Sequence, residues 1–231
     1  MESFSVYIPI DRQMALSGGQ SLPDRAEGAV LFADVSGFTP LTEMLVKKFG
    51  PQRGAEEMTF QLNNVYEAII GKVHLYKGSV ISFGGDAITC WFDGDNGQRA
   101  LTCALAMQEA MVPFKTVQIA ADAVASFSIK ASIAVGSVRR FLVGDPKVRY
   151  IEALAGKLMD RAANGEKIAK EGEVVVGSEI VRNLHVEANV FEWRTGKNDE
   201  QYAVVVTLNE DRKSTRLNSS HIQKSRMPSS A

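Results

Sequence analysis

The stretch that most constrains the fold is a pair of short apolar runs, SVISF and AITCWF, separated by Gly84, Gly85 and the acid Asp86. Two glycines between apolar runs of this length are a strong signal for a β-hairpin. We therefore expect a hairpin whose second strand opens with Asp86, within an antiparallel sheet.

A second apolar run, GAVLFADV at residues 28–35, is typical of a central strand covered by neighbouring elements. The segment after it, TPLTEMLVKKFG, predicts a helix with Thr39 as N-cap, Pro40 at the first helical position and Gly50 as C-cap. Apolar residues then recur every three or four positions from Met58 to Tyr76, which predicts a longer helix.

The remaining segments complete the order of elements. We expect a helix over residues 97–112, a half-buried strand over 127–135, extended segments at 141–143 and 148–151, a helix over 155–170, a strand over 173–177 and a hairpin within 190–206. This order predicts an α+β fold, with a ferredoxin-like β-α-β-β-α-β palm core and a mainly antiparallel sheet flanked by helices.

The chain divides into three parts by composition. Residues 1–27 contain two adjacent glycines and a proline, and we expect a lead-in with little regular structure. Residues 28–211 are expected to form one domain. Residues 212–231 hold five basic and no acidic residues, and this segment is expected to be a disordered, non-native tail.

Composition also excludes several classes of function. The formal net charge of −1 gives no reason to expect a nucleic-acid partner. The two cysteines, Cys90 and Cys103, lack CxxC spacing, which argues against a zinc site or a disulfide framework. No run approaches the roughly 20 apolar residues of a membrane span. These features predict a cytoplasmic protein.

Two acids fall at the ends of strands that are expected to be neighbours. Asp34 ends the first strand and Asp86 follows the glycine turn, so paired strands would place the carboxylates about 5 Å apart. Two carboxylates so close favour a divalent cation, and the turn at residues 36–39, which leads into a helix N-terminus, favours a polyphosphate. For either acid alone, turn formation is the better explanation, and only the pair favours metal binding.

Three segments, FADVSGFTPLTE, RGAEEMTFQLNNVYEAII and GSVISFGGDAITCWF, resemble the catalytic domain of class III nucleotidyl cyclases. The resemblance extends over about residues 28–177. It is most specific for the first (C1) cyclase domain of soluble adenylyl cyclases and their bacterial multidomain relatives. In that family a dimer of such domains converts ATP to cyclic AMP and pyrophosphate at the dimer interface, with two Mg²⁺ or Mn²⁺ ions.

The resemblance implies roles for individual residues. Asp34 and Asp86 match the two metal-binding aspartates, and the backbone carbonyl of Val35 matches a third metal ligand. The residues that match the phosphate-binding turn are Ser36, Gly37, Phe38 and Thr39. The implied mechanism is two-metal catalysis of an in-line attack on the α-phosphorus.

Four positions that grip the base and stabilise the transition state in this family depart from the pattern. They are Ser82 in place of a lysine, Ala153 in place of an aspartate or threonine, Asp160 in place of an asparagine, and Asn164 in place of an arginine. Arg161 is close to the last position, but helical geometry directs it elsewhere. The second cleft of bicarbonate-responsive relatives uses cations where this chain has Ser82 and Ala163, which argues against bicarbonate sensing.

These departures favour the interpretation that the chain is half of an enzyme. A C2-type cyclase domain would supply the missing groups, and a homodimer would be inactive. The alternative is a nucleotide-binding or regulatory module that has lost catalysis and acts through dimerisation. A weaker reading relates FGGDAI to diguanylate cyclases, although Ala87 stands where their signature has an acid. The sequence does not decide whether the substrate is ATP or GTP.

Overall fold

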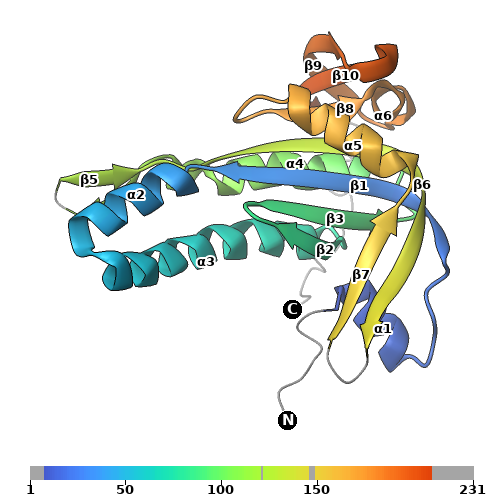
Figure 1. Ribbon diagram of the computed structural model, residues 1–231. Coiled ribbons are helices and arrows are strands. Elements are labelled where there is room, and N and C mark those ends of the chain that lie inside the picture. Colours follow the sequence, from blue (N-terminus) through green and yellow to red (C-terminus); the bar gives the residue numbers. More distant parts are fainter. Residues whose placement is uncertain (1–7, 121, 146–148, 210–231) are drawn as a thin grey trace, which may run out of the picture.

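The computed structural model describes residues 8–120, 122–145 and 149–209, and these form a mixed eight-stranded sheet with helices on both faces, together with a separate two-stranded sheet (Figure 1). The helices are α1 (Ile10–Ser17), α2 (Phe38–Phe49), α3 (Pro51–Leu75), α4 (Gln98–Ala110), α5 (Lys157–Ile168) and α6 (Ser178–Asn183), with short 3₁₀ turns at Val112–Lys115 and Lys197–Asp199. The strands are β1 (Arg25–Ser36), β2 (Ser79–Gly84), β3 (Ala87–Asp93), β4 (Val117–Ala120), β5 (Ala123–Ala125), β6 (Ser128–Asp145), β7 (Arg149–Ala155), β8 (Val174–Gly177), β9 (Glu187–Thr195) and β10 (Gln201–Asn209).

The main sheet has the strand order β2-β3-β1-β6-β8-β10-β9, with β7 paired to the far end of β6. Every pair in it is antiparallel except β6 with β8. The expected β-α-β-β-α-β core is formed by β1, β2, β3 and β6 with the helices α2, α3 and α4 between them, so the fold class is confirmed. No helix of the described residues is long and apolar enough to cross a membrane.

Alternation along β1 divides the core into two layers. Leu31 and its neighbours in register pack against α2, α3 and α4, while Val30 packs with Trp91 and Leu158 under α5. Figure 1 shows α2 and α3 below the strands and α5 above them. Asp34 has the same parity in β1 as Val30, so it belongs to the α5 face of the sheet.

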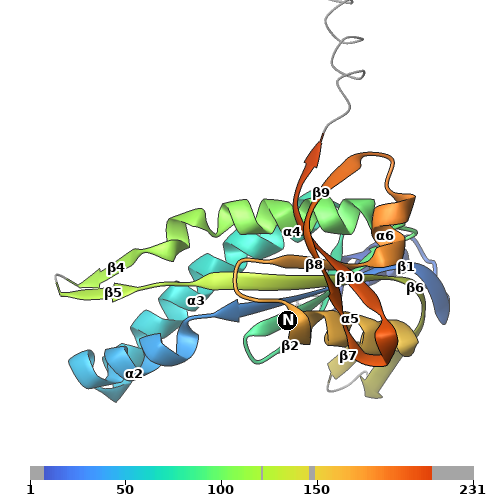
Figure 2. The ribbon, with the colours of Figure 1, turned by 90° about the horizontal axis from the view of Figure 1, so that it is seen from above.

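The long strand β6 gives the molecule its elongated shape. Seen from above, α2 and the β4–β5 hairpin lie at one end, and β7 lies at the other (Figure 2). We expected separate extended segments at 127–135 and 141–143, whereas β6 runs continuously from Ser128 to Asp145. Pairing with β1 over its first part and β7 over its last part explains this continuity.

The expectation that residues 1–27 lack regular structure is wrong within the described part. Helix α1 covers Ile10–Ser17, and β1 already begins at Arg25. The Arg12 guanidinium forms a bidentate contact with Glu152 of β7, at 2.8 and 2.9 Å. Arg140 of β6 also binds Glu152, at 2.8 Å, and binds Asp11 at 2.7 Å. This α1 ion cluster (Asp11, Arg12, Arg140, Glu152) holds the helix against the sheet. The proposed division of the chain at residues 28 and 211 stays a prediction, and the tail at 212–231 lies outside the described residues.

Candidate functional site

The two aspartates predicted to bind metal lie on adjacent elements. Asp34 is near the end of β1, where it stands opposite Ala87 of β3 on one side and Lys130 of β6 on the other. Asp86 is in the β2–β3 turn, and its carbonyl oxygen accepts a hydrogen bond from the Val35 amide at 3.1 Å. The backbone beside one aspartate is therefore bonded to the backbone of the other, as the strand pairing predicts.

The predicted phosphate-binding turn connects β1 to α2. Gly37 is the N-cap of α2 with φ of 111°, and a Cβ atom at this position would lie 2.2 Å from the Ser126 carbonyl oxygen. Only glycine fits both the dihedral angle and the space. Thr39 is therefore not the N-cap we expected, because α2 begins at Phe38, two residues before Pro40, the expected first helical position. No side chain caps α2, which leaves its first amides open to an anion.

Aromatic packing ties this turn to the Asp86 turn. The Phe38 ring is buried against Phe127, at a centroid distance of 5.1 Å, and stacks on Tyr66 of α3 at 6.2 Å. Tyr66 meets the Phe83 ring edge-on at 5.6 Å, and its hydroxyl lies 3.5 Å from the Gly85 carbonyl oxygen. Burial and then the negative charges of Asp86 and Asp34 raise the pKa of Tyr66. The Tyr66 hydroxyl therefore lies within the electrostatic influence of both aspartates.

A cation that the sequence analysis did not single out faces Asp34. The Lys130 ammonium lies 3.3 Å from Asp34 Oδ2 and 2.6 Å from Glu166 Oε1 of α5. Burial alone would lower the pKa of Lys130, but its hydrogen bonds and charge pairing with Glu166 and Asp34 outweigh burial and raise it. Lys130 is therefore a fixed positive charge beside the first predicted metal ligand.

The positions that depart from the family pattern are spread over three elements. Ser82 is exposed on β2, Ala153 is on β7, and Asp160 and Asn164 lie one turn apart on α5. Arg161 is engaged elsewhere, with its guanidinium 2.5 Å from Glu179 and 3.5 Å from Glu200. The expectation that Arg161 does not replace the missing arginine stays a prediction.

Two adjacent arginines of β6 differ in burial. Arg139 is exposed, whereas Arg140 is buried. The Arg140 side chain is 1% exposed and belongs to the α1 ion cluster.

The donor set at the aspartates can be tested against the expected cations. Within residues 8–120, 122–145 and 149–209, no three His, Cys, Asp or Glu side chains form a metal-binding group. Two carboxylates supply only part of the six oxygen ligands that Mg²⁺ prefers, and backbone, water and phosphate oxygens would complete the set. The site therefore fits a hard cation that binds together with a polyphosphate, and it does not fit a structural zinc ion.

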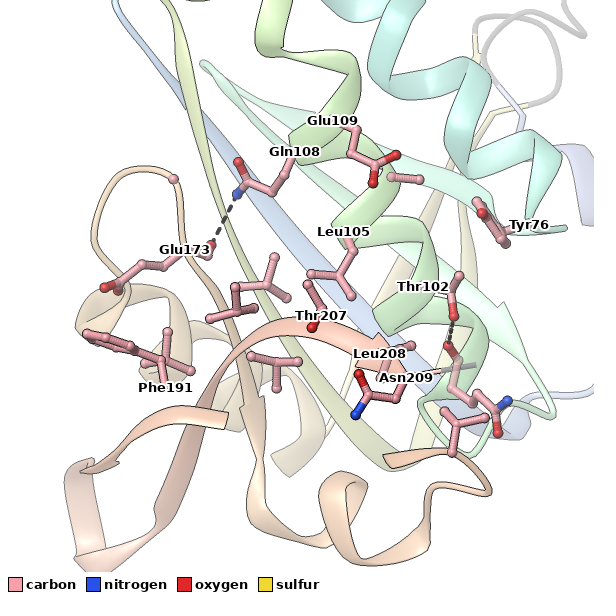
Figure 3. Close-up of a pocket in the computed structure, with 18 residues that line it drawn as sticks. Tyr76, Thr102, Leu105, Gln108, Glu109, Glu173, Phe191, Thr207, Leu208 and Asn209 are labelled. Atoms are coloured by element: carbon pink, nitrogen blue, oxygen red, sulfur yellow. Dashed lines mark hydrogen bonds between the residues drawn. The ribbon is translucent and has the colours of Figure 1, made fainter. Parts of the chain in front are cut away.

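Two pockets differ in their relation to these residues. A pocket of about 230 Å³ is lined by Asp34, Ser82, Thr89, Ala163 and Glu166, among others. A larger pocket, about 640 Å³, lies between α4 and the β9–β10 hairpin (Figure 3), and it contains none of the predicted site residues. Gln108 in the larger pocket donates a hydrogen bond to the Ile129 carbonyl at 2.8 Å. We take the smaller pocket as part of the candidate site because it adjoins Asp34.

Residues 23–205 match the family model described as the adenylate and guanylate cyclase catalytic domain. The chain belongs to this family. Its sequence is 26% identical to adenylate cyclase type 10 of Rattus norvegicus over 156 residues, which is 65% of this chain and 9% of that protein. It is 25% identical to an adenylate cyclase of Anabaena cylindrica over 197 residues, 80% of this chain and 37% of that protein. The chain thus spans about a tenth of the length of the type 10 relative.

Solved structures of the family confirm the fold of this cyclase domain. The guanylyl cyclase Cya2 superimposes with a TM-score of 0.66 and 20% identity, covering 82% of this chain and 96% of that one. The adenylyl cyclase CyaB from P. aeruginosa gives a TM-score of 0.61 at 19% identity, covering 81% of this chain and 96% of that one. Both nucleobase specificities occur among these structures, so the fold itself does not select ATP or GTP.

Sequence reasoning missed Lys130, Glu166 and Tyr66 in the site of this cyclase domain. A signal was available for Lys130, because the strand alternation places it on the face opposite the main core, which is the face that Asp34 occupies. Glu166 and Tyr66 gave no comparable signal, because their approach depends on how α5 and α3 pack on the sheet.

Proposed function

We propose that this cyclase domain is the C1-type half of an adenylyl cyclase of the cytoplasm. It would supply the metal and phosphate platform for conversion of ATP to cyclic AMP and pyrophosphate, at an interface with a complementary C2-type domain. The observation that carries the proposal is the hydrogen bond from the Val35 amide to the Asp86 carbonyl. It joins the two aspartate-bearing segments immediately before an uncapped helix N-terminus.

Each part of the platform has a task. The Asp34 and Asp86 carboxylates and the Val35 carbonyl would hold the cations, and the turn at Ser36–Thr39 would direct backbone amides at the triphosphate. Lys130, 3.3 Å from Asp34, would add a positive charge on the same face. None of these groups forms a covalent bond to the substrate.

Two divalent cations, when bound, help to deprotonate the ribose 3′-hydroxyl and neutralise the triphosphate. The 3′ oxygen then bonds to the α-phosphorus, the bond from that phosphorus to the bridging oxygen breaks, the hydroxyl proton passes to solvent, and pyrophosphate leaves. The residues of this chain orient the triphosphate for in-line attack and exclude alternative geometries.

The requirement for a partner follows from the four departing positions. Neither Ser82 nor Ala153 can recognise adenine as the family does, and Asp160 and Asn164 bring no positive charge to the transition state. Losing one such charge alone raises a barrier by about 3 kcal/mol or more. A homodimer is therefore expected to be inactive. We favour ATP because the curated relatives named above are adenylate cyclases, and GTP is the alternative.

The test is reconstitution. The purified domain is mixed with candidate C2-type domains, Mg²⁺ or Mn²⁺, and ATP or GTP, and the cyclic nucleotide is measured. We expect product only with a partner, and only while Asp34 is present. If no partner yields product that Asp34→Ala abolishes, the proposed enzyme activity is wrong.

The second candidate is a nucleotide-binding or regulatory module without catalysis, which the four departing positions favour. It would bind Mn²⁺ and a non-hydrolysable ATP analogue in a manner that Asp86→Ala abolishes, and it would yield no product with any partner. Binding without reconstitution would support the module, and reconstitution would exclude it.

A further inference from the structure

Glu166 is an acidic side chain that no part of the proposed mechanism uses, yet it makes the shortest ion pair at the site. Its Oε1 atom lies 2.6 Å from the Lys130 ammonium, compared with 3.3 Å from that ammonium to Asp34. The three side chains come from β1, β6 and α5, and each is about one-quarter exposed, at 24 to 27%. Lys130 therefore has two partners, and only one of them is a predicted metal ligand.

The Glu166–Lys130 pair is not what docks α5 onto the sheet. Leu158 and Ala162 of α5 are buried in the apolar cluster with Val30 and Trp91, and Gly165 packs directly on Ser132. A partly exposed ion pair contributes about 0.2–1 kcal/mol, which is small beside the burial of those side chains. The pair therefore needs an explanation other than the stability of the helix.

A divalent cation at Asp34 changes the balance around Lys130. The cation binds the Asp34 carboxylate, so the Lys130 ammonium loses that partner and is repelled by the positive charge of the cation. A lysine side chain is a flexible stem with a mobile charge, and without another anchor it would extend into solvent. Glu166 is the group that keeps it in place.

We propose that Glu166 is a positioning residue, which retains the Lys130 ammonium at the site when a cation occupies Asp34 and presents it to the triphosphate. In this arrangement Lys130 exchanges the Asp34 carboxylate for a phosphate oxygen while its contact with Glu166 persists. The proposal rests on the proposed metal and phosphate platform, and it adds a residue that acts on the nucleotide only through Lys130.

The negative charge of Glu166 allows the positioning role to be distinguished from simple repulsion of the triphosphate. If Glu166 were only a nearby anion, its replacement by glutamine would remove a charge that repels triphosphate, and triphosphate would bind more tightly. If Glu166 positions Lys130, the same replacement frees the ammonium, and triphosphate binds more weakly. The two roles thus predict opposite changes.

The experiment uses the manganese complex of inorganic tripolyphosphate, which needs no base-binding groups from a partner. Its binding to the full chain is measured by titration calorimetry for wild type, Glu166→Gln, Glu166→Asp and Asp34→Ala. The matched control is Glu173→Gln, which removes one partner of the Arg194 ion pair on β9, where the shortest contact is also 2.6 Å. Thermal unfolding of each variant checks that it is folded.

We expect Glu166→Gln to weaken binding about fivefold, the equivalent of ~1 kcal/mol, and Glu166→Asp to recover most of the loss, because the lysine stem can follow the shorter carboxylate. Glu173→Gln should stay within about twofold of wild type. Unchanged or tighter binding in Glu166→Gln, with binding that still depends on Asp34, overturns the positioning role alone. Wild-type binding that is absent, or that Asp34→Ala leaves intact, overturns the platform and the positioning role together.

Discussion

The α1 ion cluster offers a sharp prediction about stability, because its central carboxylate is fully buried. The Glu152 side chain is 0% exposed and binds both Arg12 and Arg140, whose side chains are 10% and 1% exposed. Replacing Glu152 by glutamine keeps the shape and removes the charge. The two buried guanidinium groups then depend on Asp11, a 22% exposed carboxylate that pairs with the Arg140 guanidinium and accepts a hydrogen bond from the Arg12 backbone amide at 2.8 Å.

The expected loss follows from the asymmetry of buried ion pairs. Removing one partner of such a pair costs about 3–5 kcal/mol, because the remaining charge stays desolvated and unpaired. For a domain of this size each kcal/mol lowers the melting temperature by about 2–4 °C, so Glu152→Gln should melt about 6–20 °C below wild type. Circular dichroism during heating measures the shift.

A matched control separates burial from the mere presence of an ion pair. Glu173→Gln disrupts a bidentate contact with Arg194, but those side chains are 19% and 14% exposed, so it should cost about 1 kcal/mol or less. A combined replacement of Arg12, Arg140 and Glu152 by apolar residues should recover much of the loss. If Glu152→Gln melts no lower than Glu173→Gln, the reasoning about the α1 ion cluster is wrong.

Three further predictions address the site and the core. Lys130→Met should tighten Mn²⁺ binding in the absence of nucleotide about fivefold, because an ammonium 3.3 Å from Asp34 contributes ~1 kcal/mol of competing attraction, and titration followed by electron paramagnetic resonance would show it. Weaker Mn²⁺ binding would contradict this competition. Gly37→Ala should destabilise the domain by about 1–3 kcal/mol in urea unfolding, since φ of 111° is closed to alanine, and a neutral result would mean that the turn rearranges. Burial raises the pKa of the Cys90 thiol and raises that of the Cys103 thiol to about 12. Both thiols therefore stay protonated in the folded chain at a pH near 9, where the same thiols ionise in the unfolded chain. Stability should therefore fall as pH rises above 9, by up to about 1.4 kcal/mol per pH unit for each thiol, and the Cys90→Ala/Cys103→Ala variant should lack this slope.

The sequence predicts the sheet core well because its signals are local. The glycine turn at Gly84-Gly85, the strand ending at Asp34 and the helix stop at Gly50 depend on residues next to one another. Gly50 has φ of 80°, as its expected place at a helix end requires. These features fix the order of the elements and, through it, the adjacency of the two aspartate turns.

The same reasoning fails where structure depends on distant pairing. Helix α1 is short and polar, and its anchor is a contact between Arg12 and Glu152, which lie 140 positions apart. The burial of Arg140 has the same cause, because its partners come from α1 and β7. No periodicity in either segment carries this information, so the burial of both arginines becomes visible only in the folded structure.

The charges around the candidate site support the proposal that a second domain completes the enzyme. Lys130 is already balanced by two carboxylates, so a triphosphate gains little net positive charge from it until a cation takes Asp34. Arg161, the cation expected nearest to the missing arginine position, is held by Glu179 and Glu200. Arg161 is therefore not free to neutralise charge that develops in the transition state, and the role proposed for Lys130 is to bind the triphosphate. Under the proposed function, the partner domain brings an arginine or lysine to the opposite side of the triphosphate, so it is best sought among domains that carry the cations this one lacks.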